Sequence, residues 1–128
     1  MTVPTLGGFV YDCPDPAALA EFYRAVLDWG PAEAHAVAGD NWVVLTNPQG
    51  GPRFEFQRVE DYQAPEWPSA GKPQQAHLDL DVPDIDAAHG RVLALGAKLL
   101  DDSPESFRVY ADPVGHPFCL CACGPATA

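Results

Sequence analysis

The chain has 128 residues, of which 47% are hydrophobic and 20% are charged, a balance typical of a globular protein and not of a disordered one. Its 18 acidic residues outnumber 7 Lys and Arg, and the net charge of −11 argues against nucleic acid or an anionic membrane as a partner. No apolar run reaches the roughly 20 residues that cross a bilayer. Residues 1–6 also lack the pattern of a signal peptide, so we expect a single cytoplasmic domain whose four cysteines are reduced.

The first half of the chain predicts a strand, a helix and three further strands. Residues 8–13 alternate between two sets of side chains, which is typical of a strand with one packed face. Asp15 has the position of a helix N-cap and Pro16 that of the first helical residue, while Gly30-Pro31 ends the helix. The helix has an apolar stripe at Leu19, Tyr23, Val26 and Leu27. The later strands are predicted near residues 33–37, 41–46 and 53–59.

The second half repeats this order. The segment Asp12-Cys13-Pro14-Asp15 recurs as Asp81-Val82-Pro83-Asp84, each time between a strand pattern and a helix pattern. Here Asp84 is the expected N-cap and Gly96 the expected helix end. The helix stripe is predicted at Ile85, Ala88, Val92 and Leu95, and the strands at residues 75–82, 97–100, 107–111 and 117–123. We therefore predict an α+β fold of two tandem βαβββ modules: module one at 1–59, a connector at 60–74 and module two at 75–124.

These segments resemble the vicinal oxygen chelate superfamily of glyoxalase-like, bleomycin resistance and extradiol dioxygenase proteins. Residues 13–23 resemble the opening helix of glyoxalase-like proteins, and residues 77–86 resemble the start of their second module. Residues 95–97 and 112–118 complete the pattern. The resemblance implies two curled mixed sheets that enclose a cleft for a small ligand. The superfamily contains lyases, isomerases, dioxygenases and drug-binding proteins, so it leaves open whether this chain is an enzyme.

The resemblance also implies positions for a divalent metal, because family enzymes similarly take ligands from the first and last strands of each module. Those positions here are Gly8, which has no side chain, His77, Glu55 or Gln57, and Cys119. Zinc accepts His, Glu and Cys together with a water, whereas an oxygen-rich iron or manganese site is poorly served by a thiol. Since one donor of four is missing, we predict no intact family metal site and no cofactor.

The predicted ligand site is the cleft formed by the strand faces opposite the helices. Carboxylates with few nearby cations favour a neutral or cationic small organic molecule, and Trp42 offers a stacking surface on a face that the sequence leaves undetermined. Asp79 and Glu55 are also considered as an acid–base pair, although such pairs are more often solvated. The candidate contacts are Val10, Trp42, Glu55, Gln57, His77, Asp79 and Cys119.

Two alternatives stay open at this point. The first is a divalent-metal-dependent lyase, isomerase or dioxygenase that uses His77, Glu55 or Gln57, and Cys119. The second is a domain that acts through protein contacts.

The connector around Trp67 has three possible roles: a lid over the cavity, a homodimer contact or a packed surface loop. The thiols of Cys119, Cys121 and Cys123 share one side of an extended strand but stand too far apart to chelate one ion together, so we predict that they line the cavity.

Overall fold

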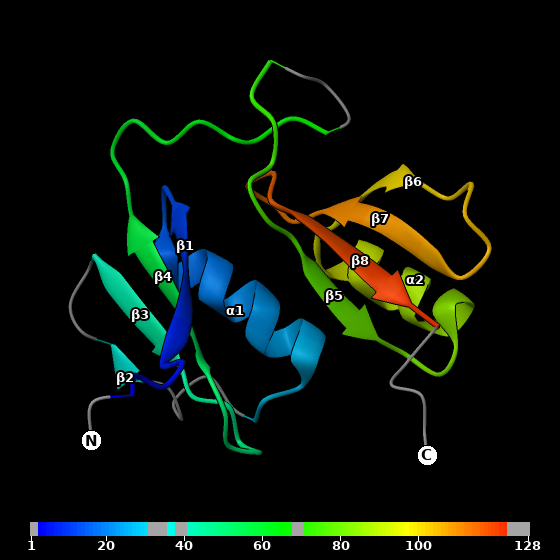
Figure 1. Cartoon of the computed structure of the whole chain (residues 1–128). Helices are drawn as coiled ribbons and strands as arrows, with labels where there is room; N and C mark the ends of the chain where they lie inside the picture. The colour runs from blue at the N-terminus through cyan, green and yellow to red at the C-terminus, as the bar shows by residue number, and fades with distance from the viewer. Residues whose placement is uncertain (1–2, 31–35, 38–40, 68–70, 123–128) are drawn as a thin grey trace. The chain divides into compact units, whose positions relative to one another are not determined.

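The chain forms two compact units, Met1–Tyr62 and Gln63–Ala128. The computed structural model describes residues 3–30, 36–37, 41–67 and 71–122 (Figure 1). The boundary between the units falls inside the predicted connector, residues 60–74. Within these described ranges no helix is long and apolar enough to cross a membrane.

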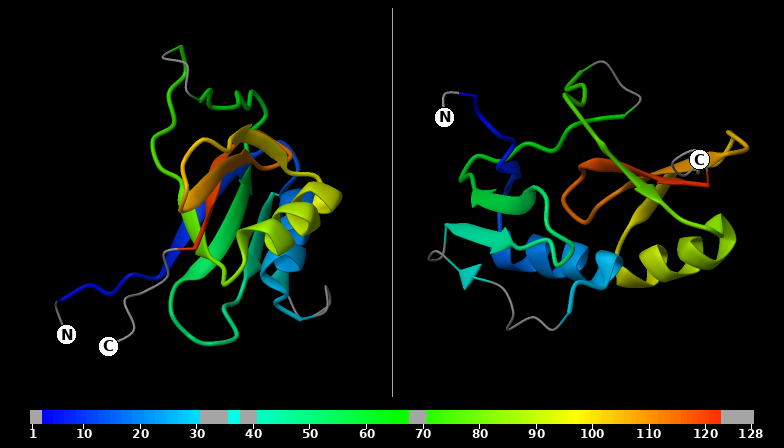
Figure 2. Two further views of the ribbon diagram at one scale, coloured as in Figure 1. Left: turned by 90° about the vertical axis from the view of Figure 1, so that its right-hand side faces the viewer. Right: turned by 60° about the horizontal axis from the view of Figure 1, so that its bottom comes forward.

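Unit one contains a mixed sheet with one helix. Its elements are β1 (Gly8–Cys13), α1 (Pro16–Leu27), β2 (Ala36–Val37), β3 (Trp42–Leu45) and β4 (Arg53–Arg58). The strand order is β1-β4-β3-β2, with β1 parallel to β4 and the other neighbours antiparallel. Figures 1 and 2 show α1 lying across one face of this sheet, where it contacts β3, β4 and β1. The strand predicted near 33–37 contains β2; residues 33–35 lie outside the described residues.

Unit two repeats the architecture. Its elements are β5 (Leu78–Asp81), α2 (Ile85–Leu95), β6 (Lys98–Asp101), β7 (Phe107–Ala111) and β8 (Pro117–Cys121). The strand order is β5-β8-β7-β6, again with the first strand parallel to the last. The matching topologies confirm the predicted pair of βαβββ modules in an α+β fold. Curling of the sheets around a cleft stays a prediction, and the predicted strand end at Cys123 lies outside the described residues.

The repeated Asp residues start the two helices in the same way. The carboxylate of Asp15 accepts a hydrogen bond from the backbone N–H of Ala18, and that of Asp84 accepts one from Ala87, both at 3.3 Å. Both caps have extended backbone angles, so each aspartate satisfies an N–H that the helix itself leaves without a partner. Both N-cap predictions are confirmed.

The core of unit one lies between α1 and the sheet and is largely aromatic. Tyr23 of α1 is fully buried, with its ring centroid 4.8 Å from Phe54 and 5.9 Å from Phe56 on β4. Leu19 and Leu45 are buried with these rings. These contacts hold the inward side chains of β4 under the helix and leave its alternate residues on the other face.

The core of unit two is thinner under its helix, and the predicted stripe of α2 is only partly buried. Of the predicted stripe only Val92 is buried, and Leu95 is 37% exposed. His89, on the same helix, is half-buried, and its Nδ1 lies 2.8 Å from the Tyr110 hydroxyl. Burial raises the pKa of Tyr110, and the neighbouring Arg108 guanidinium offsets part of that rise. The polar contact between His89 and Tyr110 thus replaces part of the apolar packing that the helical spacing predicted for α2.

The connector is seated on the turn between β7 and β8. The Asp112 carboxylate accepts hydrogen bonds from the backbone N–H groups of Val114 and His116, both at 3.0 Å. Gly115 in this turn has a φ of +102°, and a Cβ placed there would lie 2.7 Å from the Cβ of Ala64. The absence of a side chain at Gly115 therefore lets the connector pass directly over the turn.

We expect Gly115→Ala to lower the free energy of unfolding by about 2 kcal/mol or more, because the substitution adds both backbone strain and a clash with Ala64. The matched control is Gly90→Ala in α2, where an added Cβ meets nothing within 4 Å. This control should stabilise the protein by about 0.5–1 kcal/mol, the ordinary helix preference for alanine. Urea unfolding of both variants measures the difference, and equal stabilities would contradict the seating of the connector.

Candidate functional site

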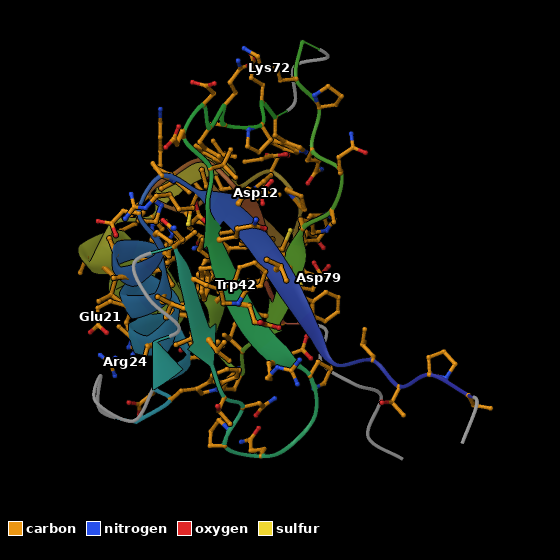
Figure 3. The ribbon with its side chains drawn as sticks, turned by 90° about the vertical axis from the view of Figure 1, so that its left-hand side faces the viewer. Asp12, Glu21, Arg24, Trp42, Lys72 and Asp79 are labelled. Carbon is orange, nitrogen blue, oxygen red and sulfur yellow. The ribbon has the colours of Figure 1, made fainter. Side chains whose placement is uncertain are left out.

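The face of the unit-one sheet opposite α1 carries all four residues predicted for that module. Val10 on β1 is paired with Glu55 on β4, and Trp42 on β3 is paired with Gln57 on β4. Paired residues on neighbouring strands project to the same face, and Glu55 and Gln57 are two residues apart on one strand. The register therefore settles the face of Trp42, and it places both Glu55 and Gln57 on this uncovered face, onto which Figure 3 gives a view with Trp42 labelled.

Glu55 is held in place by two neighbours. Its Oε1 accepts a hydrogen bond from the indole Nε1–H of Trp42 at 2.8 Å, and its Oε2 lies 3.5 Å from Nε of Arg53. The residue is only 9% exposed, so these partners replace much of the water that a carboxylate needs. The same bond fixes the plane of the Trp42 ring. Gln57, by contrast, is exposed.

Gly8 leaves the space that the Glu55 carboxylate occupies. A Cβ placed on Gly8 would lie 2.6 Å from Glu55 Oε2 and 2.9 Å from the backbone oxygen of Arg53. A side chain at this position is thus incompatible with the present Glu55 geometry. In unit one, therefore, one of the metal positions that the resemblance implied has no donor, and the carboxylate at the other already has two partners.

In unit two, His77, Asp79 and Cys119 converge. Asp79 on β5 is paired with Cys119 on β8, and His77 Nε2 lies 3.3 Å from Asp79 Oδ1. One donor atom from each of the three residues lies within 4.8 Å of the others. His77 and Asp79 are exposed while Cys119 is buried, so the group combines two donors that face solvent with one buried thiol.

Cys119 belongs to an apolar cluster on the face of the unit-two sheet opposite α2. The cluster consists of Val109, Cys119 and Cys121, with Trp67, Leu100 and Phe107 packed against it. The connector therefore covers part of this face through Trp67. That Cys119 and Cys121 line a ligand cavity stays a prediction, and Cys123 lies outside the described residues.

Comparison with known proteins agrees with this architecture. A family model described as a glyoxalase-like domain matches residues 8–121. The chain belongs to this family. The comparison with curated proteins found no match.

Solved structures share the fold of this glyoxalase-like domain. A glyoxalase/bleomycin resistance protein/dioxygenase family enzyme from Burkholderia phytofirmans PsJN aligns with a TM-score of 0.70 at 18% identity, covering 91% of this chain and 97% of that one. The fosfomycin resistance protein FosX from Mesorhizobium loti aligns with a TM-score of 0.67 at 14% identity, covering 98% and 95%. At these identities the likeness shows the fold alone. Membership among glyoxalase-like proteins, which the sequence resembles, rests on the family model over residues 8–121.

The glyoxalase-like domain also has a groove that sequence reasoning did not find. It has a volume of about 670 Å³ and is lined by the connector, the β7–β8 turn and the start of β6, including Trp67, Lys98 and Leu100. None of the predicted unit-two contacts lines it. Sequence reasoning also missed Arg53. Its spacing from Glu55 on one strand places both residues on the open face, but their ion pair depends on the space that Gly8 leaves because it has no side chain.

We expect Gly8→Ala to displace the Glu55 carboxylate, to break its bond to Trp42 and to lower the free energy of unfolding by about 1–3 kcal/mol, as overpacking does. The matched control is Gly7→Ala, whose Cβ would meet only the flexible end of the Arg53 side chain, at 3.2 Å. Urea unfolding measures both variants, and the near-ultraviolet circular dichroism of Trp42 reports the lost bond. Equal behaviour of the two variants would show that Glu55 does not occupy the space over Gly8.

Proposed function

We propose that this glyoxalase-like domain binds a small organic molecule on the sheet faces that its helices leave uncovered, without an intact family metal site. The proposed contacts are Val10, Trp42, Glu55 and Gln57 in unit one and His77, Asp79 and Cys119 in unit two. The observation that carries the proposal is the bond from Trp42 to Glu55, because it fixes an aromatic ring on an open face before any ligand arrives.

Trp42 favours a ligand with a planar aromatic group. Its indole N–H is already satisfied by Glu55, so the ring contributes its flat surface and not a hydrogen bond to the ligand. Val10 lies on the same face and adds a partly exposed apolar contact. The exposed Gln57 side chain, paired with both Trp42 and Asp12, can donate to or accept from polar substituents at the edge of a stacked ring.

The charges on these faces favour a neutral or cationic ligand. The charge of Arg53 is offset by Glu55, while Asp79 is an exposed carboxylate on the open face of unit two. A cation stacked on Trp42 gains attraction from the ring quadrupole in addition to burial of its apolar surface. An anion gains neither this attraction nor a favourable field in a chain of net charge −11.

The metal-dependent alternative fits unit one poorly. Gly8 has no donor atom, and a metal at Glu55 would compete with both Trp42 and Arg53 for the carboxylate. Gln57 offers only a weak neutral oxygen for a divalent ion. We therefore favour a site that recognises its ligand by stacking and hydrogen bonds. We do not favour a metal held jointly by the four positions that the family resemblance implies.

The test uses N-methylquinolinium, a planar aromatic cation, titrated into the protein and followed by tryptophan fluorescence and by isothermal calorimetry. We expect Trp42→Leu to weaken its binding by about 5- to 150-fold, the range of a lost stacking contact of roughly 1–3 kcal/mol. Quinoline-2-carboxylate, a planar aromatic anion, should bind more weakly than the cation to the unchanged protein.

Trp29→Phe is the matched control, because Trp29 follows α1 and is not among the open-face residues. It should change the affinity less than twofold. Binding of N-methylquinolinium that is absent, or that survives Trp42→Leu unchanged, would contradict the assignment of Trp42 as the stacking surface.

A further inference from the structure

Three side chains of types that can ligate a metal, His77, Asp79 and Cys119, meet within unit two. We propose that His77, Asp79 and Cys119 form a zinc site that needs no residue of unit one. The sequence predicted no metal from the donors at the positions that the family resemblance implied, and Asp79 is not one of those positions. The inference does not depend on the proposed organic ligand, because it concerns metal binding by the protein on its own.

The backbone brings the three donors together. His77 precedes β5 directly and Asp79 lies two residues later, so both side chains project to the face opposite α2. Asp79 is paired across the parallel strands with Cys119, which completes a triangle of donor atoms within 4.8 Å. Bonds of 2.0–2.3 Å place tetrahedral zinc ligands about 3.5 Å apart, so side-chain movements on the order of 1 Å close the site.

The donor types select the ion. A thiolate, an imidazole and a carboxylate together suit zinc, whereas magnesium, calcium and manganese prefer oxygen donors throughout. Three protein ligands leave a fourth tetrahedral position for water or another small donor, which is the arrangement of catalytic and not of structural zinc. His77 and Asp79 are exposed, with side chains 42% and 61% accessible, so an ion can enter from solvent.

A second observation that supports the site is that Cys119 is firmly packed in the apolar cluster. Cys119 is only 6% exposed, and its cluster with Val109 and Cys121 is covered by Trp67, Leu100 and Phe107. Its backbone is fixed between β5 and β7 by pairing with Asp79 and Val109. The buried thiol is thus preorganised, which limits the entropy lost on binding. The two exposed ligands are those that move.

The site differs from the arrangement implied by the family resemblance in one testable respect. That arrangement draws donors from both modules, at Gly8, at Glu55 or Gln57, at His77 and at Cys119. Here Asp79 supplies the third donor from the same strand region as His77, while Glu55 remains bonded to Trp42 and Arg53. Variants at Asp79 and at Glu55 therefore distinguish the two arrangements directly.

The experiment titrates untagged, metal-free full-length protein with Co²⁺ and follows the sulfur-to-cobalt charge-transfer absorption, with Zn²⁺ competition giving the zinc affinity. We expect one ion per chain with a thiolate band. Asp79→Asn and His77→Gln should each weaken zinc by about 10-fold or more, and Cys119→Ser should abolish the band. Circular dichroism confirms that each variant is folded, and the exposed positions of His77 and Asp79 leave the core unchanged.

Two matched controls complete the test. Asp81→Asn changes the next exposed carboxylate on β5, which is paired with Cys121 and not with Cys119, and it should leave zinc affinity within twofold. Glu55→Gln should also leave it within twofold. The proposal is overturned if the protein shows no thiolate band, if Asp81→Asn weakens zinc as much as Asp79→Asn, or if Glu55→Gln does so. No organic probe is present, so this result and that with N-methylquinolinium stand separately.

Discussion

The parallel pairing of the first strand with the last strand of each unit is the constraint on which the candidate site depends. It sets Val10 beside Glu55 in unit one and Asp79 beside Cys119 in unit two, at equivalent places of the repeat. A shift of one residue in either pair would turn these side chains under the helix. The aromatic contacts of Tyr23 in unit one, and the contact of His89 with Tyr110 in unit two, oppose such a shift because they seat each helix on the alternate residues.

The two units share this frame and carry different side chains on it. In unit one a glycine faces a carboxylate that is bonded to an indole and paired with a guanidinium, so this carboxylate and the indole N–H already have partners. In unit two the equivalent positions carry an imidazole, an exposed carboxylate and a thiol. The repeated frame thus carries an indole bonded to a carboxylate in one unit and three metal-ligating side-chain types in the other.

How much could be predicted from the sequence follows from how local each signal is. The helix caps at Asp15 and Asp84 and the strand alternation depend on neighbouring residues, and the structure agrees with them. The partner of His89 lies on a distant strand, and the face of Trp42 depends on the register of β3 with β4, neither of which periodicity specifies. Arg53 and Glu55 share one strand, but the place of the Glu55 carboxylate depends on the space that Gly8 leaves on β1. The place of Asp79 beside His77 was visible in the alternation, but its distance from Cys119 required the β5–β8 register.

The difference between Glu55 and Asp79 explains why a metal is expected on one face and not on the other. Drawing Glu55 onto an ion would leave the half-buried N–H of Trp42 without its acceptor, at a cost of about 1–3 kcal/mol, and would also separate the carboxylate from Arg53. Asp79 is mostly solvated, and its contact with His77 is an exposed pair worth about 1 kcal/mol at most. Its carboxylate can therefore turn towards a metal at little expense, so Asp79, although further from the family's pattern, is the better ligand of the two.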